Sequence, residues 1–436
     1  MKKIVGLLAA AAVLATSVFA ADVSAKVRVG GNIFEAAPAA NEKGDDATAL
    51  KLLNADTISH TYDAPFATLT TSTDNAGGTV KFVGDENGLK AGDVQVWFKP
   101  IDVLKIQAGS QDFAMNKETI DWTQHHGQQA YDTYGYSLGF AQDAISANIA
   151  FGTGDNGWFF EDPIAKYGTK EEPATAYVKD LYANFAYGAD FGTISAFFRY
   201  RGKSLEGIDT VKAQAAAATP DFSKVKVKYN PTEINFGAAY KNTIDALTFF
   251  VNVVATSKSA ATDKEFDIAK LAALGATVEG FETDKDGKAR SVFGLGVDAF
   301  VQYSADALTV KGFVKYDTAD FGHLTLKDGE MKEDIMADNN TIIELLARVD
   351  YKLDNGIGIF AYFKNGNLLL KKKAANSTDK DPSSVFESTI KLGASGNVGI
   401  ASWETCLQFD TGILDAKKEN FNKVKISMPV WVQVAF

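Results

Sequence analysis

The side chains best suited to chemistry gather in one polar stretch, Ser110–Ala130, which reads SQDFAMNKETIDWTQHHGQQA. It contains carboxylates, a lysine and two histidines, namely Asp112, Lys117, Glu118, Asp121, His125 and His126. Histidine with carboxylates is a common ligand set for zinc, and histidine beside serine or aspartate is the basis of nucleophilic hydrolysis. Metal binding and catalysis are therefore the two chemistries to weigh first.

Neither chemistry is favoured by the spacing. Adjacent residues of an extended chain point apart, so His125 and His126 are poorly placed to share one metal ion. The chain has two further histidines, His60 and His323, and no G-x-S-x-G turn that would present a nucleophilic serine. The sequence therefore predicts no catalytic residue, no metal site, no cofactor and no enzyme activity.

The N-terminus indicates export. Lys2 and Lys3 precede an apolar run, and Val18-Phe19-Ala20 fits a cleavage site, so residues 1–20 are predicted to be a removed signal peptide. Cys406 is the single cysteine, which excludes a disulfide-stapled secreted module. The net charge of −11 becomes −13 without Lys2 and Lys3, since 42 basic residues then face 55 acidic ones. Such an acidic chain is a poor candidate for nucleic-acid binding.

The last residues of the chain set the pattern for the rest. From Val424 to Phe436 apolar residues alternate with mixed ones, which predicts a strand with one apolar face that ends on an aromatic residue. The same alternation recurs in hairpins with short turns rich in Asp, Asn and Gly. These hairpins are centred on the turns near residues 102, 143, 189, 244, 305, 355 and 396. A weaker hairpin is predicted at Phe66–Val83, and a short helix at Asp46–Leu53.

Long polar segments separate the hairpins, whereas the turns within them are short. The long segments are 110–130, 153–175, 202–232, 257–290, 318–340, 365–384 and 410–422. Short turns at one end and long loops at the other are typical of a transmembrane β-barrel. A Greek-key sandwich does not sort its connections in this way.

Aromatic residues mark both ends of the apolar faces. Next to the short turns they are Phe98, Phe140, Tyr187, Tyr240, Tyr303, Tyr351 and finally Phe436. Before the long loops they are Phe151, Tyr200, Tyr316, Phe363 and Phe409. Two aromatic rings one strand length apart are expected where an apolar band meets lipid headgroups on its two sides.

With these features the chain resembles bacterial outer-membrane porins, in its architecture and its C-terminal phenylalanine rather than in a motif that names a solute. The resemblance implies an all-β, transmembrane, antiparallel up-and-down β-barrel that spans residues 21–436 as one domain. We expect about eighteen strands, or sixteen if the Phe66–Val83 hairpin lies outside the membrane, with short periplasmic turns and long extracellular loops. Outer-membrane lipid, the barrel assembly machinery that would read Phe436 and a homotrimer follow from the same resemblance.

In a lipid-embedded barrel the second face of each strand lines the interior. The bases predicted there include Lys26, Arg28, Lys99, Lys105, Arg199, Arg201, Lys311, Lys315, Arg348 and Lys364. If they are unpaired the pore would favour anions, and if they pair with interior acids little field remains. The inward aromatics include Trp97, Phe250, Phe300, Tyr362 and Trp431. These rings either bind the flat faces of sugars or fill the interior beneath inserted loops.

The porin resemblance also gives the opening stretch a role. The third external loop of such porins commonly folds inward and narrows the channel, and here that loop is Ser110–Ala130. Its candidate constriction residues are Asp112, Lys117, Glu118, Asp121, His125 and His126. The sequence thus predicts passive diffusion of small hydrophilic solutes through a basic-lined pore. The alternative is a surface adhesin or structural barrel that binds ligands through its long loops.

Overall fold

The structure is a computed structural model of the chain. It describes residues 22–40, 46–54, 66–85, 88–113, 115–116, 126, 131–152, 160–161, 177–178, 180–202, 204–206, 210, 213–214, 217, 219, 221–230, 232–258, 275–279, 291–318, 341–370, 385–411 and 424–435. Phe436 lies outside these residues. Among the residues described, none forms a helix of the length and hydropathy that a membrane crossing needs.

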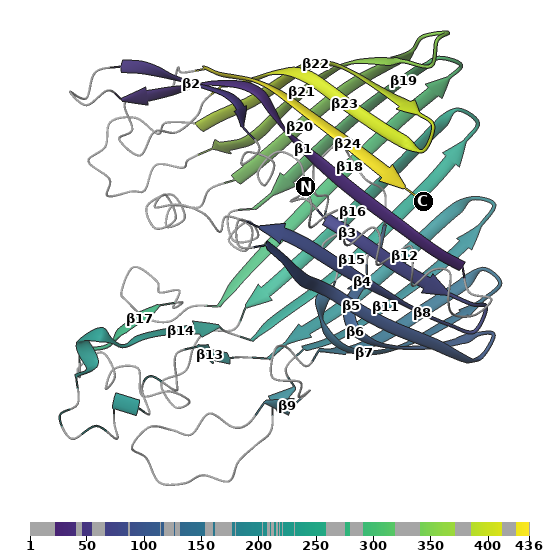
Figure 1. The fold of residues 1–436 in the computed structure, drawn as a ribbon. Helices are drawn as coiled ribbons and strands as arrows, with labels where there is room; N and C mark the ends of the chain where they lie inside the picture. Colours follow the sequence, from purple (N-terminus) through teal and green to yellow (C-terminus); the bar gives the residue numbers. More distant parts are fainter. Residues whose placement is uncertain are drawn as a thin grey trace.

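Nineteen of the described strands make one antiparallel sheet. Figure 1 shows how this sheet curves into a barrel. One of them, β2 (Asp46–Asn54), pairs with an extension of β1, and the other eighteen follow one another around the barrel in chain order. These are β1 (Asp22–Ala40), β3 (Phe66–Ser72), β4 (Ala76–Asp85), β5 (Gly88–Ile101), β6 (Leu104–Phe113), β7 (Tyr131–Gln142), β8 (Ile145–Gly152), β11 (Asp180–Ala189), β12 (Gly192–Arg201), β15 (Glu233–Ile244), β16 (Leu247–Lys258), β18 (Val292–Ala305), β19 (Leu308–Asp317), β20 (Thr341–Lys352), β21 (Gly358–Leu370), β22 (Val385–Val398), β23 (Ala401–Thr411) and β24 (Val424–Ala435). The prediction of eighteen strands is confirmed, including the weak hairpin, now β3–β4.

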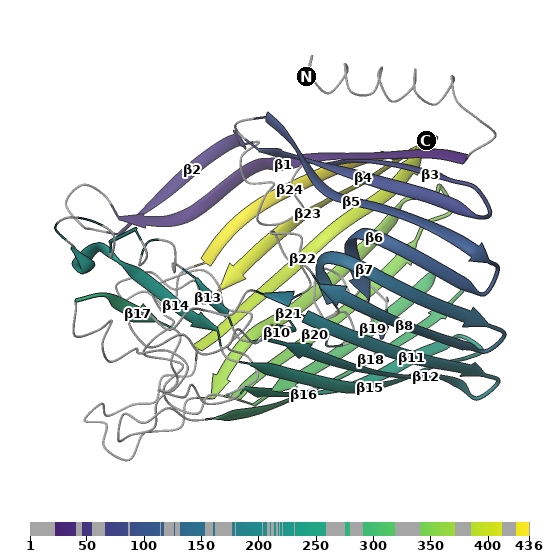
Figure 2. The same cartoon turned by 90° about the horizontal axis from the view of Figure 1, so that it is seen from below.

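The two ends of the chain meet along β1. Its register with β24 runs from Lys26 opposite Ala435 to Ala36 opposite Ile426, and β3 and β2 pair with successive parts of its other edge. β24 also pairs with β23, so the last strand pairs with both its predecessor and the first strand. Figure 2 shows β1 beside β24. The register with β24 shifts beside Pro429, which has no N–H to donate, and the extra residue lies in β1 between Asn32 and Glu35.

Alternation decides which side chains face outward. In β16 the outward residues Val251 and Val253 are exposed, whereas the intervening Phe250, Asn252 and Val254 are buried. Paired residues on neighbouring strands share a face, so this phase continues from strand to strand. An apolar outer surface and a more polar inner surface are the result.

Turn chemistry explains the tight hairpins. Three of the short turns contain an aspartate with a positive φ, which are Asp143, Asp245 and Asp306. Aspartate tolerates this left-handed conformation better than most residues, and hairpin turns require it because its twist matches that of the strands. The short turns gather at one end of the barrel (Figures 1 and 2).

The long connections contain structure that the sequence did not predict. A three-stranded sheet joins β13 (Ser204–Glu206), β14 (Lys226–Asn230) and β17 (Thr277–Glu279), next to the 3-10 helix η3 (Phe222–Lys224). A two-stranded piece joins β9 (Phe160–Glu161) and β10 (Tyr177–Val178). The helix predicted at Asp46–Leu53 is wrong, because this segment is β2 and pairs with β1 from Asn32 to Ala40.

The aromatic residues at the strand ends face outward. Phe98, Phe140, Tyr187, Tyr303 and Tyr351 are all exposed near the short turns, and Tyr316 and Phe363 are exposed near the long loops. Tyr240 is partly buried and donates its hydroxyl to the carbonyl oxygen of Phe191, 2.6 Å away. An exposed ring with a polar edge is suited to the boundary between lipid tails and water.

The junction of β1 and β24 has little space, which gives a test of the fold. A Cβ at Gly30 would lie 2.6 Å from the carbonyl oxygen of Val430 and 2.9 Å from the Cβ of Trp431, and the first of these is backbone. We expect Gly30→Val to destabilise the barrel by about 1–3 kcal/mol, the usual cost of overpacking. Gly312→Val is the matched control, because the Cβ there meets only Val301 at 3.5 Å. The measurement is the unfolding temperature, taken as the temperature at which the band of the compact, folded protein disappears from a detergent gel. Equal unfolding temperatures for both variants would contradict the register at this junction.

Candidate functional site

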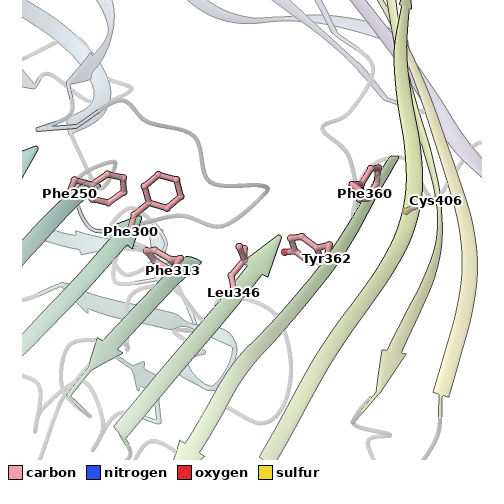
Figure 3. Packing of buried hydrophobic residues seen from close by; sticks show 7 residues of the cluster. All are labelled: Phe250, Phe300, Phe313, Leu346, Phe360, Tyr362 and Cys406. Atoms are coloured by element: carbon pink, nitrogen blue, oxygen red, sulfur yellow. The ribbon is translucent and has the colours of Figure 1, made fainter. Parts of the chain in front are cut away.

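The interior is lined by rows of side chains that cross neighbouring strands. One row is apolar and joins Phe250, Phe300, Phe313 and Leu346, which are paired in turn on β16, β18, β19 and β20. Each of the four is at most 5% exposed. The rings of Phe250 and Phe300 stack with centroids 5.0 Å apart. Figure 3 shows this row together with Phe360, Tyr362 and Cys406.

Polar rows lie on both sides of the apolar one. Toward the long loops the paired residues are Asn252, Asp298, Lys315 and Glu344. Toward the short turns they are Gln302, Lys311, Arg348, Tyr362 and Lys391. The guanidinium carbon of Arg348 lies 4.2 Å from the ring centre of Phe360, and the Lys391 ammonium lies 5.1 Å from that of Tyr362. Cations are held over rings here, so aromatic and charged side chains share one surface.

The segment after β6 begins against the inner wall. Phe113 stacks on Tyr182 of β11 at 5.7 Å, and Tyr182 stacks on Phe197 of β12 at 5.9 Å. Met115 packs on the same cluster, and its carbonyl oxygen accepts a hydrogen bond of 3.2 Å from the hydroxyl of Ser195. These contacts place the start of the segment across the inner faces of β11 and β12.

His126 marks a second contact of the same segment with the wall, further round the barrel. Its backbone N–H donates to Asp298 of β18 at 2.5 Å, and its ring Nε2 lies 2.6 Å from a carboxylate oxygen of Asp317 on β19. The histidine side chain is fully buried. Asp298 also accepts from the amide of Asn252, and Asp317 lies 3.7 Å from the Lys315 ammonium. Two carboxylates from neighbouring strands thus hold one residue of the segment.

Five of the ten inward bases named in the sequence analysis have a carboxylate close by, and Lys315 beside Asp317 is one of them. Arg199 and Arg201 lie 2.6 and 3.9 Å from Asp180. Arg348 lies 2.6 Å from Asp350 and 3.7 Å from Glu404. Lys364 lies 3.2 Å from Glu344. Of the two alternatives left open by the sequence, paired interior charges therefore apply to this part of the wall.

The remaining predicted residues divide into three groups. Trp97, Lys99, Lys105, Lys311 and Trp431 face inward and are partly buried. Asp112 is exposed at the end of β6, and Lys26 and Arg28 belong to β1, where the structure describes their backbone alone. Lys117, Glu118, Asp121 and His125 lie outside the described residues, as does Phe436.

Some of the acidic residues that face the interior were not identified as inward-facing from the sequence. Asp317 is one of these, although it lies two residues after Lys315 and so on the same face of β19. Glu35 is another, at 3.1 Å from Lys425. The register shift between Asn32 and Glu35 moves Glu35 to the inner face, and an alternation count along β1 cannot show such a shift.

The described residues contain no cluster of three or more His, Cys, Asp or Glu side chains that could hold a metal ion. What these residues do present along the inner wall are ion pairs, ring faces and amides.

No protein-family profile and no curated protein matches the chain. Solved structures that align with it include OpdQ of Pseudomonas aeruginosa, at 10% identity and a TM-score of 0.46, covering 95% of this chain and 98% of that one. The outer membrane channel DcaP of Acinetobacter baumannii aligns at 11% identity and a TM-score of 0.46, covering 95% and 97%. The trimer form of the outer membrane protein OmpT of Vibrio cholerae aligns at 9% and 0.43, covering 95% and 99%. The fold described above rests on the chain's own strand pairings.

The contacts of His126 predict that its backbone amide is protected from hydrogen exchange. A hydrogen bond to a buried carboxylate contributes about 1.5–3 kcal/mol, so losing it should speed local opening roughly ten- to a hundredfold. We expect Asp298→Ala to raise the hydrogen-exchange rate of the His126 amide by that factor. Asp93→Ala is the control, since Asp93 is a half-exposed carboxylate of β5 that faces Lys81 at 3.8 Å. An unchanged exchange rate of the His126 amide in Asp298→Ala would contradict the contact between His126 and the barrel wall.

Proposed function

We propose that the chain is an outer-membrane channel through which small hydrophilic solutes diffuse passively. One observation carries the proposal: eighteen strands present an apolar face outward, while the inner face carries ion pairs, amides and lysines. Barrels of this strand number are wide enough to enclose an aqueous channel. Filtering by width and by wall charge requires no chemical step.

The segment after β6 is proposed to set the width of the passage. Its contacts at Met115 and His126 lie on inward faces of β12, β18 and β19, so it reduces the open cross-section along this side of the barrel. Solutes would then pass along the opposite arc, where Trp97, Gln95, Trp431 and Gln433 face inward and keep part of their surface exposed. The loop residues named in the sequence analysis remain candidates for the constriction.

The selectivity proposed here is a mild preference for anions. Arg199, Arg348 and Lys364 contribute little to it, because each faces a carboxylate within 3.2 Å. Lys99 and Lys105 of the opposite arc face inward and keep part of their surface exposed, which would let them act on permeating ions. A paired interior charge still orients polar solutes, but it adds little net field along the pore.

Outer-membrane location, homotrimer formation, export by the N-terminal signal and recognition of Phe436 by the barrel assembly machinery belong to the same proposal. The apolar outer surface supports membrane insertion, since strands in lipid need all their backbone groups paired and their outer side chains apolar. The trimer and the assembly signal rest on the resemblance to porins alone.

Refolded protein in a planar lipid bilayer tests the channel directly. We expect stable conductance steps of uniform size, because a fixed barrel holds one passage open. A barrel filled by its own segments would instead give no steps. The second outcome would favour the surface adhesin, for which the small sheet of β13, β14 and β17 among the long connections is the supporting observation.

A salt gradient across the same bilayer tests the selectivity. We expect a reversal potential that indicates more permeant chloride than potassium, and we expect the double substitution Lys99→Glu with Lys105→Glu to reverse its sign. Lys364→Gln should change the reversal potential far less, because Glu344 already opposes that charge. Cation preference in the unaltered protein would contradict the assignment of these lysines to the passage.

A further inference from the structure

The strand β2 is paired along one of its edges only. β2 pairs with the part of β1 from Asn32 to Ala40, and it pairs with no other strand of the described residues. The edge of β2 that faces away from β1 therefore presents a row of backbone N–H and C=O groups to its surroundings. We propose that this edge binds an extended peptide segment of another protein, which adds to β2 as a further antiparallel strand. The inference rests on the proposed outer-membrane location, which places β2 on the outside of the cell.

Two leucines lie side by side on the outward face of β2. Leu50 is 65% exposed and Leu52 is 67% exposed, whereas the outward-facing Val251 and Val253 of β16 are each 40% exposed. The valines have neighbouring strands on both sides, and the leucines have a neighbouring strand only on the side of β1. The free edge of β2 is thus accompanied by an uncovered apolar surface.

The height of this surface along the barrel axis argues against lipid as its partner. A row of directly paired residues connects β2 to the exposed ring of Phe363 near the long loops, and its members are Leu50, Ala36, Ile426, Phe409, Ile390 and Phe363. Strands about 4.8 Å apart and tilted by about 40° shift such a row by about 3 Å along the axis at each step, or about 15 Å from Phe363 to Leu50. Figure 2 shows that the shift is away from the short turns, because β2 extends beyond the ends of β23 and β24. Leu50 therefore lies outside the hydrocarbon layer whose boundary is marked by rings such as that of Phe363.

The sequence of β2 does not protect its edge against pairing. Exposed strand edges are commonly protected by proline, by bulges, by short length or by several charges. β2 is 9 residues long and reads DATALKLLN, with one lysine, one aspartate and no proline. Its register with β1 is unbroken from Phe34 to Ala40. An unprotected edge of this length is suited to accept a strand.

An extended peptide is the ligand chemistry that matches both features. Its backbone can pair with the free edge, and every second side chain can lie beside Leu50 and Leu52. A lipid tail could cover the leucines, but it has no group that can hydrogen-bond to the edge. A second copy of this chain is less suited, because two strands tilted by about 40° and related by a twofold axis along the membrane normal cross at about 80° instead of pairing.

Hydrogen exchange of the β2 amides tests the free edge, measured by NMR on the full-length protein in lipid nanodiscs that each hold one copy. Alternate N–H groups of an edge strand point toward its partner and away from it. We therefore expect every second amide of β2 to exchange at least about tenfold faster than its neighbours. A peptide of the same length as β2, in which valine and threonine alternate between terminal lysines, should slow the fast amides. The same peptide with proline at its centre should leave them fast, because proline has no N–H to donate.

Substitution of the two leucines tests the apolar part of the surface. Leu50→Asn combined with Leu52→Asn should raise the peptide concentration needed for half-maximal slowing about tenfold, since the peptide valines lose their apolar neighbours. The alternation of fast and slow amides in the free protein should remain. Val398→Asn is the matched control, because Val398 is 71% exposed and lies at the end of β22 next to the short turns. Peptide binding should be unchanged in this variant.

Slow exchange of every β2 amide before peptide is added would overturn the inference, because the chain itself would then cover the edge. Fast amides that stay fast with the valine–threonine peptide, equal slowing by both peptides, or equal losses in the leucine variant and in Val398→Asn would overturn it as well. Protection that appears only in nanodiscs with two or more copies would assign the edge to a second copy of the chain. None of these results depends on conductance, so the loss of this inference would leave the proposed channel in place.

Discussion

The structure depends on the pairing of backbone hydrogen-bonding groups around the barrel. A strand in lipid has no water to satisfy its N–H and C=O groups, so each strand needs a partner on both sides. β1 meets this demand at the junction of the two chain ends, with β24 along one edge and with β3 and β2 along the other. The junction is adapted to its tight geometry by Gly30 opposite Trp431 and by a register shift beside Pro429. Because neighbouring strands are paired in turn, this register determines which side chains of each strand point inward and which point outward.

Alternation then converts the pairing into two surfaces of different chemistry. Outward residues form the apolar surface with aromatic rings at the strand ends, and inward residues form rows of charge, amides and rings. The interior is organised further by neighbours across strands, because Asp180 holds Arg199 and Glu344 holds Lys364. The segment that reaches His126 uses the same carboxylate chemistry to lie on the wall. In the proposed channel, restriction of the passage and selection of solutes would both originate in the inward face.

The sequence predicted what depends on local pattern. Period-two alternation and turn residues such as Asp143 and Asp306 gave the strands, the hairpins and the strand number. It failed where a partner distant in the chain decides, as in Asp46–Asn54, whose composition suits a short helix and whose pairing with β1 makes it a strand. The ion pairs of the interior depend on the same cross-strand register, so the sequence alone could not decide whether the inward bases are paired. Glu35 shows the limit most clearly, because a register shift moves it inward without any local signal.

The most direct measurement of the central claim is the accessibility of nitroxide labels placed one at a time along β18 from Val297 to Gln302, with Cys406 replaced by serine. In lipid vesicles, collisions with dissolved oxygen should be most frequent at Val297, Ala299 and Val301, and least frequent at the three intervening positions. This period of two, in this phase, is what an apolar outer face and a polar inner face require. A uniform profile, or maxima at residues 298, 300 and 302, would contradict the account.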